Sequence, residues 1–180
     1  VAANIPVVLA TTGLSEQQKV SLVEAAKNLP IVWAPSMSMA VNLTMKVAQQ
    51  ITETLKDVAG GIDIEILERH HRYKADAPSG TALRFGELIA EKLDEAPKHV
   101  HGREGLTGQR SRNEIGYHAI RVGDNPGEHT IVFGMMGETI DMTVRGQSRD
   151  SYANGAIAAA KFLVAQGPGL YSMEDVLGFS

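Results

Sequence analysis

The 180-residue sequence has no cysteine, which excludes disulfide bonds, thiolate nucleophiles and cysteine-ligated zinc. It also has no cluster of lysine and arginine, and its net charge is −4, so we expect no nucleic-acid partner. The longest apolar runs, such as residues 5–10, are far too short to span a bilayer, so we expect no membrane partner. These absences together favour a cytoplasmic protein.

The residues that are present give an ordinary globular composition, with 43% hydrophobic and 21% charged residues. A β-branched run over 6–11 predicts a buried strand that ends in a turn. Ser15, with Gln18 at the capping-box position, predicts a helix to about Lys27. A second apolar strand is expected over 31–34. Strand, helix and strand at this spacing predict a parallel sheet.

The next segment changes to a helical period, which predicts one long amphipathic helix over 38–58. Its apolar face is expected to contain Ala40, Leu43, Val47, Ile51, Leu55 and Val58. A strand over 62–69 follows, in which isoleucines alternate with other residues. A further helix is predicted over 79–93.

The last part of the sequence is expected to be mainly strands. Residues 95–114 lack periodicity and predict a loop that is either functional or mobile. Three strands follow over 115–122, 128–135 and 138–146, and a final helix over 151–166. The predicted fold class is therefore α/β plus α+β, with a parallel sheet followed by a mixed, mostly antiparallel sheet and flanking helices.

Groups that could bind an anion and move a proton gather where the strand over 62–69 ends. Ser79-Gly80-Thr81 opens the next helix, and a helix N-terminus presents free N–H groups and a positive dipole end to a carboxylate or phosphate. His70 or Lys74 could transfer a proton near neutral pH. The competing interpretation is a set of solvated loop residues beside an ordinary serine N-cap.

Two other site types are weaker hypotheses. A metal-dependent hydrolase would use His70, His71, His99 and His101, but adjacent strand residues point to opposite faces and His70 and His71 cannot easily share an ion. We therefore predict no metal site. Glycines over 102–108 resemble a nucleotide loop only superficially, because no buried strand precedes them and no helix follows. A flexible loop is the better interpretation.

Turns after the first two strands are candidates for cofactor contacts on position alone. Thr11-Thr12-Gly13 follows one strand of the predicted parallel sheet, and Ala34-Pro35-Ser36-Met37 follows the next. In an open α/β sheet the ligand crevice lies outside the carboxyl ends of the strands.

The motif Glu68-x-His70-His71-x-x-Lys74-x-Asp76-Ala77-Pro78-Ser79-Gly80-Thr81-Ala82 strongly resembles the signature of the bacterial dihydrodipicolinate reductase family. Members of this family are 4-hydroxy-tetrahydrodipicolinate reductases of lysine and diaminopimelate biosynthesis. Other blocks match in order along the chain: Ala10 to Gly13, Ala34 to Ser38 with Val41-Asn42, Arg103 to Gly108, Gly127 to Thr130 and Ser148 to Ala156.

The resemblance implies a Rossmann domain that binds NADH or NADPH and a second domain that binds a small dicarboxylate and forms a homotetramer through its sheets. It implies His70 and Lys74 as catalytic proton carriers. It implies substrate binding by His71, Ser79, Gly80 and Thr81. The residues implied on the nicotinamide side are Ala10, Thr11, Thr12, Ala34, Pro35, Ser36 and Met37.

Two departures from the family pattern qualify these expectations. Ala10 stands where the family's loop usually begins with glycine, and its methyl group is expected to crowd the cofactor. The chain begins after the glycine-rich fingerprint, so we expect the N-terminal part of the Rossmann domain to be lacking. The expected division is 1–37 with about 152–180 as the dinucleotide-binding remnant, and about 38–151 as the substrate-binding and tetramerisation domain. A non-catalytic dicarboxylate-binding or assembly fragment is the alternative function.

Overall fold

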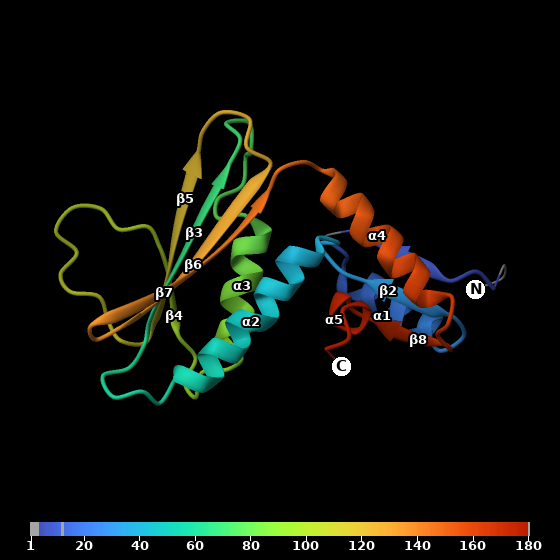
Figure 1. The fold of residues 1–180 in the computed structure, drawn as a ribbon, viewed down its shortest axis with the longest axis horizontal. Coiled ribbons are helices and arrows are strands. Elements are labelled where there is room, and N and C mark those ends of the chain that lie inside the picture. Colours follow the sequence, from blue (N-terminus) through green and yellow to red (C-terminus); the bar gives the residue numbers. More distant parts are fainter. Residues whose placement is uncertain (1–3, 12, 180) are drawn as a thin grey trace. The chain divides into compact units, whose positions relative to one another are not determined.

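The computed structural model describes residues 4–11 and 13–179. The chain forms two compact units (Figure 1). The first contains the described residues up to Leu43 together with those from Arg149 onward, and the second is Thr44–Ser148. A parallel sheet lies in the first unit and a mixed sheet with flanking helices in the second, which confirms the predicted fold class.

The parallel sheet of the first unit has the strand order β1-β2-β8. Its strands are β1 (Val7–Leu9), β2 (Pro30–Trp33) and β8 (Gly169–Tyr171), and its helices are α1 (Glu16–Ala26), α4 (Asp150–Leu163) and α5 (Met173–Val176). Ser15 caps α1 in a full capping box with Gln18, as predicted. The prediction missed β8 and α5, because elements of three and four residues are too short to show a period.

The mixed sheet of the second unit has the strand order β4-β5-β3-β6-β7. Its strands are β3 (Asp63–His70), β4 (Lys98–His101), β5 (Glu114–Arg121), β6 (Gly127–Met135) and β7 (Glu138–Gly146). Pairings β4–β5 and β5–β3 are parallel, whereas β3–β6 and β6–β7 are antiparallel. Half of the strand pairings in this sheet are therefore antiparallel, whereas the sequence predicted a mostly antiparallel sheet. Strand β4 lies inside the segment predicted as a loop, because its mostly exposed side chains carry no apolar alternation.

Helices α2 (Met39–Leu55) and α3 (Gly80–Ala90) complete the second unit, although α2 begins in the first. The predicted apolar face of α2 is wrong: Leu43 and Val47 are 43% and 39% exposed. The buried positions are instead Val41, Met45, Ala48, Gln49 and Thr52. A polar Thr52 is tolerated there because its hydroxyl donates to the carbonyl of Ala48 at 2.8 Å.

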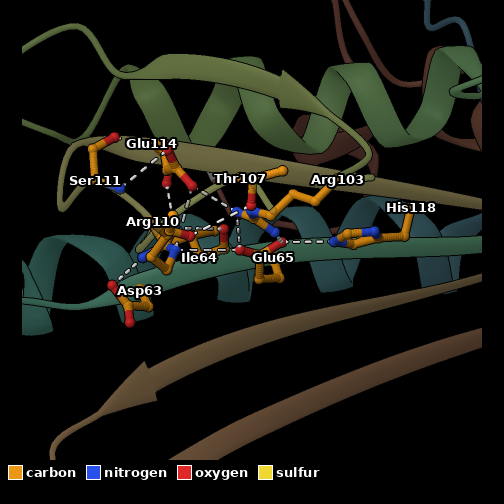
Figure 2. Close-up of polar contacts among 10 residues, drawn as sticks. Asp63, Ile64, Glu65, Arg103, Thr107, Arg110, Ser111, Glu114 and His118 are labelled. Carbon is orange, nitrogen blue, oxygen red and sulfur yellow. Dashed lines mark hydrogen bonds and ion pairs between the residues drawn. The ribbon is translucent and has the colours of Figure 1, made fainter. Parts of the chain in front are cut away.

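The loop between β4 and β5 is tied to the mixed sheet by ion pairs (Figure 2). Arg103 bridges Glu65 at 2.7 Å and Glu114 at 2.6 Å, and Arg110 pairs with Asp63 and Glu65. Hydrogen bonds from Arg103 and Ser111 lower the pKa of Glu114 to about 2. These contacts anchor both ends of a segment that the sequence suggested would be flexible.

Candidate active site

The carboxyl end of β3 carries a buried polar pair on the apolar side of the strand. Glu68 and His70 have the same parity along β3 as Ile64 and Ile66, which are core residues at 2% and 0% exposure. Glu68 is 1% exposed and His70 is 8% exposed. A charged side chain in this position requires partners, because an unpaired buried charge is strongly unfavourable.

The carboxylate of Glu68 receives four hydrogen bonds from three parts of the second unit. Its Oε2 is 2.6 Å from Nδ1 of His70 and 2.7 Å from Nη1 of Arg121. Its Oε1 accepts from Nη2 of Arg121 at 2.6 Å and from the backbone N–H of Ser79 at 3.0 Å. Burial raises the pKa of Glu68, but the hydrogen bonds from Arg121 and His70 outweigh it and hold the pKa below its usual range.

A second buried histidine, His129 on β6, lies beside this pair. Its ring centroid is 5.2 Å from that of His70, and its Nε2 is 3.0 Å from the hydroxyl of Ser79. Burial lowers the pKa of His129 to about 4, and the nearby charges of His70 and Lys74 act in the same direction. His129 is therefore a neutral hydrogen-bonding group at neutral pH.

The loop that follows β3 is held by the turn between β5 and β6. The backbone N–H of His71 donates to the carbonyl of Asn125 at 2.8 Å, and that of Arg72 donates to Gly123 at 3.0 Å. Arg121 also donates to the backbone carbonyl of Asp76 at 2.7 Å. Within the described residues, Nδ1 of His71 is buried without a hydrogen-bond partner, and a ligand could supply one.

Lys74 extends from this loop with its side chain 21% exposed. Its ammonium lies 2.7 Å from Oδ1 of Asp76, whose side chain is 60% exposed. Hydrogen bonding to Lys74 lowers the pKa of Asp76. A substrate carboxylate could therefore replace the solvated carboxylate of Asp76 as the partner of the Lys74 ammonium.

The first turn of α3 completes the arrangement. The hydroxyl of Ser79 accepts from the N–H of Ala82 at 3.2 Å and contacts His129, and Ser79 is only 2% exposed. Gly80 is exposed and Thr81 is half-buried, and their N–H groups lie in the first turn, where intrahelical acceptors are absent. Ser79 thus shapes the helix end, and Gly80 and Thr81 present donors beside it.

The candidate cofactor residues lie in the first unit, at the carboxyl ends of paired parallel strands. Strands β1 and β2 pair in register from Val7 and Ile31 to Leu9 and Trp33, so the turns that follow lie at one edge of the sheet. Ala10, Thr11 and Pro35 are exposed and Ser36 is half-buried. Ala34 and Met37 are buried in the core of this unit. Thr12 lies outside the described residues.

The structure therefore brings His70, Glu68 and the start of α3 together, and it adds three residues that were not predicted as site residues. Arg121, Gly127 and His129 come from β5 and β6, about 50 residues away along the chain. A β-carbon at Gly127 would lie 2.9 Å from Nε2 of His70, so glycine there leaves room for the ring. Parity along β3 was the available signal, since it places Glu68 on the buried side.

The histidines of the metal hypothesis do not gather into one site in the part of the chain that the structure describes. His99 and His101 stack on Tyr117 with centroids 5.7 and 5.0 Å away, apart from the pair at His70. No group of three or more histidine or acidic residues suited to a metal ion occurs among the described residues. None of the described helices is long and apolar enough to cross a bilayer.

Comparison with known proteins gives consistent relatives. The family model described as dihydrodipicolinate reductase, C-terminus, matches residues 40–177, and the one described as dihydrodipicolinate reductase, N-terminus, matches residues 1–37. The 4-hydroxy-tetrahydrodipicolinate reductase of Rhodopirellula baltica is 70% identical over 100% of this chain and 65% of its own length. That of Hahella chejuensis is 49% identical over 96% of this chain and 64% of its own length.

A solved structure described as dipicolinate-bound dihydrodipicolinate reductase from Paenisporosarcina sp. TG-14 superposes with a TM-score of 0.74 at 27% identity. It covers 94% of this chain and 63% of that protein. The chain thus spans about 65% of the length of the curated relatives that it matches. On these matches, the chain belongs to the dihydrodipicolinate reductase family.

Proposed function

We propose that this chain functions as a 4-hydroxy-tetrahydrodipicolinate reductase, which reduces dihydrodipicolinate to tetrahydrodipicolinate with NADH or NADPH in lysine and diaminopimelate biosynthesis. The observation that carries the proposal is the cluster at the end of β3. There, a buried histidine, a lysine and the N-terminus of α3 lie on one short stretch of chain, and together they offer proton carriers and N–H donors to a dicarboxylate substrate. The high identity to reductases of this name supports it.

Substrate binding is assigned to Ser79, Gly80 and Thr81 at the start of α3 and to His71, which follows β3. The N–H groups of Gly80 and Thr81 would hold one carboxylate, aided by the positive end of the helix dipole. His71 would offer its unpartnered Nδ1 to the ligand. Ser79 would act by capping α3 and orienting its first turn, since its hydroxyl already makes two hydrogen bonds. The related solved structure is described as dipicolinate-bound, and a dicarboxylate of that kind suits this chemistry.

The catalytic roles go to His70 and Lys74. His70 would hold or transfer a proton at Nε2, because its Nδ1 is occupied by Glu68. Lys74 would exchange Asp76 for the substrate and deliver a proton from its ammonium. Groups that transfer protons in this way typically contribute a factor of roughly 100 to 10,000 to a rate.

The carboxyl ends of β1 and β2 fit a nicotinamide cofactor in position, because they form the kind of sheet edge where such ligands bind. NADH or NADPH would supply the hydride. Exposed Ala10, Thr11 and Pro35, with Ser36 beside them, would contact the ring, whereas Ala34 and Met37 would contribute backbone groups from the core. Thr12 is proposed with them from the motif alone. This division makes residues 1–37 and about 152–180 the dinucleotide-binding part.

The mixed sheet and its helices, at about 38–151, are proposed as the substrate-binding and tetramerisation domain of a cytoplasmic homotetramer. The sheet side that carries Glu65, His118 and the anchored loop is polar and half-buried, which is suited to contact with further copies of the chain. Light scattering of the purified protein tests this assembly. A monomer at micromolar concentration contradicts it.

The experiment that tests the substrate site is titration with pyridine-2,6-dicarboxylate by calorimetry. We expect saturable binding that weakens about tenfold in Thr81→Pro, which removes a helix N–H, and in His71→Asn. The matched control is His99→Asn, a histidine on β4 with no proposed substrate contact. Equal affinity in all four proteins refutes the assignment.

The alternative function is a dicarboxylate-binding or assembly fragment without catalysis. Spectrophotometry of NADH oxidation by the full-length protein, with and without the dihydrodipicolinate precursor, separates the two. Oxidation that depends on the precursor supports the reductase, and His70→Gln or Lys74→Ala should reduce turnover strongly. Normal turnover in both variants contradicts the roles assigned to them.

A further inference from the structure

We infer that Glu68 is a positioning residue, which fixes the tautomer and orientation of His70 and joins it rigidly to the first turn of α3. The inference rests on the proposed function, because His70 matters only if it handles a proton during the reaction. Glu68 itself would not touch the substrate. Its side chain is fully buried, and both of its carboxylate oxygens already accept hydrogen bonds from protein donors.

The proton on Nδ1 of His70 is fixed by the hydrogen-bond partner of that nitrogen. A carboxylate can only accept hydrogen bonds, and Oε2 of Glu68 is 2.6 Å from Nδ1. Nδ1 must therefore carry the proton, and Nε2 is the ring nitrogen left for chemistry. Nε2 lies beside Gly127, where the absence of a side chain leaves it space. The ring is thus held in one tautomer, with its reactive nitrogen turned away from Glu68.

Arg121 keeps Glu68 ionised and in place. Two parallel hydrogen bonds of 2.7 and 2.6 Å join the guanidinium to the carboxylate, a geometry that fixes orientation as well as charge. The same guanidinium donates to the carbonyl of Asp76 at 2.7 Å. Arg121 therefore links Glu68 to Asp76, in the loop that carries Lys74.

Glu68 is also bonded to the proposed substrate-binding turn. Oε1 accepts the backbone N–H of Ser79, the N-cap of α3, at 3.0 Å. One carboxylate thus sets the relative position of the ring of His70 and the N–H groups of Gly80 and Thr81. An apolar residue of similar volume could fill this part of the core, but it could supply neither acceptor. The four hydrogen bonds therefore indicate a role beyond packing.

The test is Glu68→Gln, which preserves shape but replaces one oxygen with an NH₂ group. Arg121 and the N–H of Ser79 can only donate, whereas Nδ1 of His70 can lose its proton and accept. The amide should therefore turn its NH₂ toward His70 and drive the ring to the Nε2–H tautomer. Spectra of the full-length protein with ring-¹⁵N-labelled histidine report this change, and the signal that is lost in His70→Gln is assigned to this ring.

The kinetic expectation is a split between kcat and KM. We expect kcat of Glu68→Gln to fall roughly 100-fold, the lower end for losing a proton-transfer group, with KM changed less than about threefold. Glu68→Asp keeps a carboxylate acceptor, so it should retain the Nδ1–H tautomer and recover part of kcat. The control is Glu87→Gln, which removes an exposed carboxylate from α3 and breaks its ion pair to Arg84.

Each outcome decides the matter. A flipped tautomer, a low kcat and partial recovery in Glu68→Asp support the inference. An unchanged tautomer in Glu68→Gln overturns it, as does wild-type kcat, or an equal loss of kcat in Glu87→Gln. If the wild-type protein shows no reductase activity, the proposed function fails by itself, and the tautomer measurement still decides whether Glu68 controls His70.

Discussion

Replacing Gly155 with alanine should loosen the segment that enters α2, even though alanine is the better helix former. Gly155 lies in α4 and packs against the backbone of Met37 within the first unit. A β-carbon at position 155 would lie 1.7 Å from the carbonyl oxygen of Met37 and 2.8 Å from its carbonyl carbon. The neighbour is main chain, so no side-chain rotation can relieve the overlap.

Two opposing energies decide the sign of the effect. Glycine to alanine inside a helix stabilises by about 1 kcal/mol. Reaching an ordinary contact of 3.4 Å requires a shift of about 1.7 Å, which must move α4 or the backbone of Met37. Overpacking of this kind costs about 1 to 3 kcal/mol, and a rigid backbone partner favours the upper end. We therefore expect a net loss of about 2 kcal/mol in the unfolding free energy of this unit.

The assay uses Trp33, the only tryptophan, which lies in β2 of the same unit. Its fluorescence during urea unfolding reports on this unit without a contribution from the other. With a slope of about 2 kcal/mol/M, the midpoint should fall by about 1 M. Asn154→Ala is the control, because residue 154 is exposed on α4 and should gain slightly. A Gly155→Ala midpoint equal to or above wild type refutes the packing argument.

Three further predictions follow from other contacts. Hydrogen bonds from Arg103 and Ser111 lower the pKa of Glu114 from 4.5 to about 2, so its ionised carboxylate contributes fully to the free energy of unfolding above about pH 4.5 and loses that contribution as the pH falls toward 2. In urea titrations, the difference in free energy of unfolding between wild type and Glu114→Gln should therefore shrink from pH 7 to pH 3. Gly127→Ala places a methyl group 2.9 Å from Nε2 of His70 at a φ of 153°, so turnover should fall about tenfold or more, whereas Gly134→Ala on the same strand β6, whose methyl group makes only an ordinary 3.6 Å contact with Cβ of Asp63, should affect turnover little. Arg103→Ala should speed tryptic cleavage within 104–112 several-fold, because two ion pairs anchor that segment; unchanged cleavage argues against the anchor.

Much of the fold was predictable because its signals are local. The capping box of Ser15 and Gln18, the N-cap at Ser79 and the alternation along β3 each depend on residues a few positions apart. The strand β4 and the packing face of α2 were not predicted, since each depends on a distant partner. Strand β4 is defined only by its pairing with β5. The buried face of α2 contains Gln49 and Thr52, whose polarity hides it from a hydrophobic count.

The candidate site likewise contains residues that are close in sequence, which a motif can show, and partners that are distant in sequence, which it cannot. The stretch from Glu68 to Thr81 was visible as a set of proton carriers before a helix start, because those residues are close in sequence. The carboxylate of Glu68, which lies 2.6 Å from Nδ1 of His70, is paired with Arg121, 53 residues further along the chain. No short pattern contains that pair. The same parity of Glu68, Ile64 and Ile66 places the carboxylate of Glu68 on the core side of β3, and a buried carboxylate must have a cationic partner somewhere in the chain. Sequence reasoning can therefore predict that such a partner exists, while the pairing of β3 with β5 is needed to identify it.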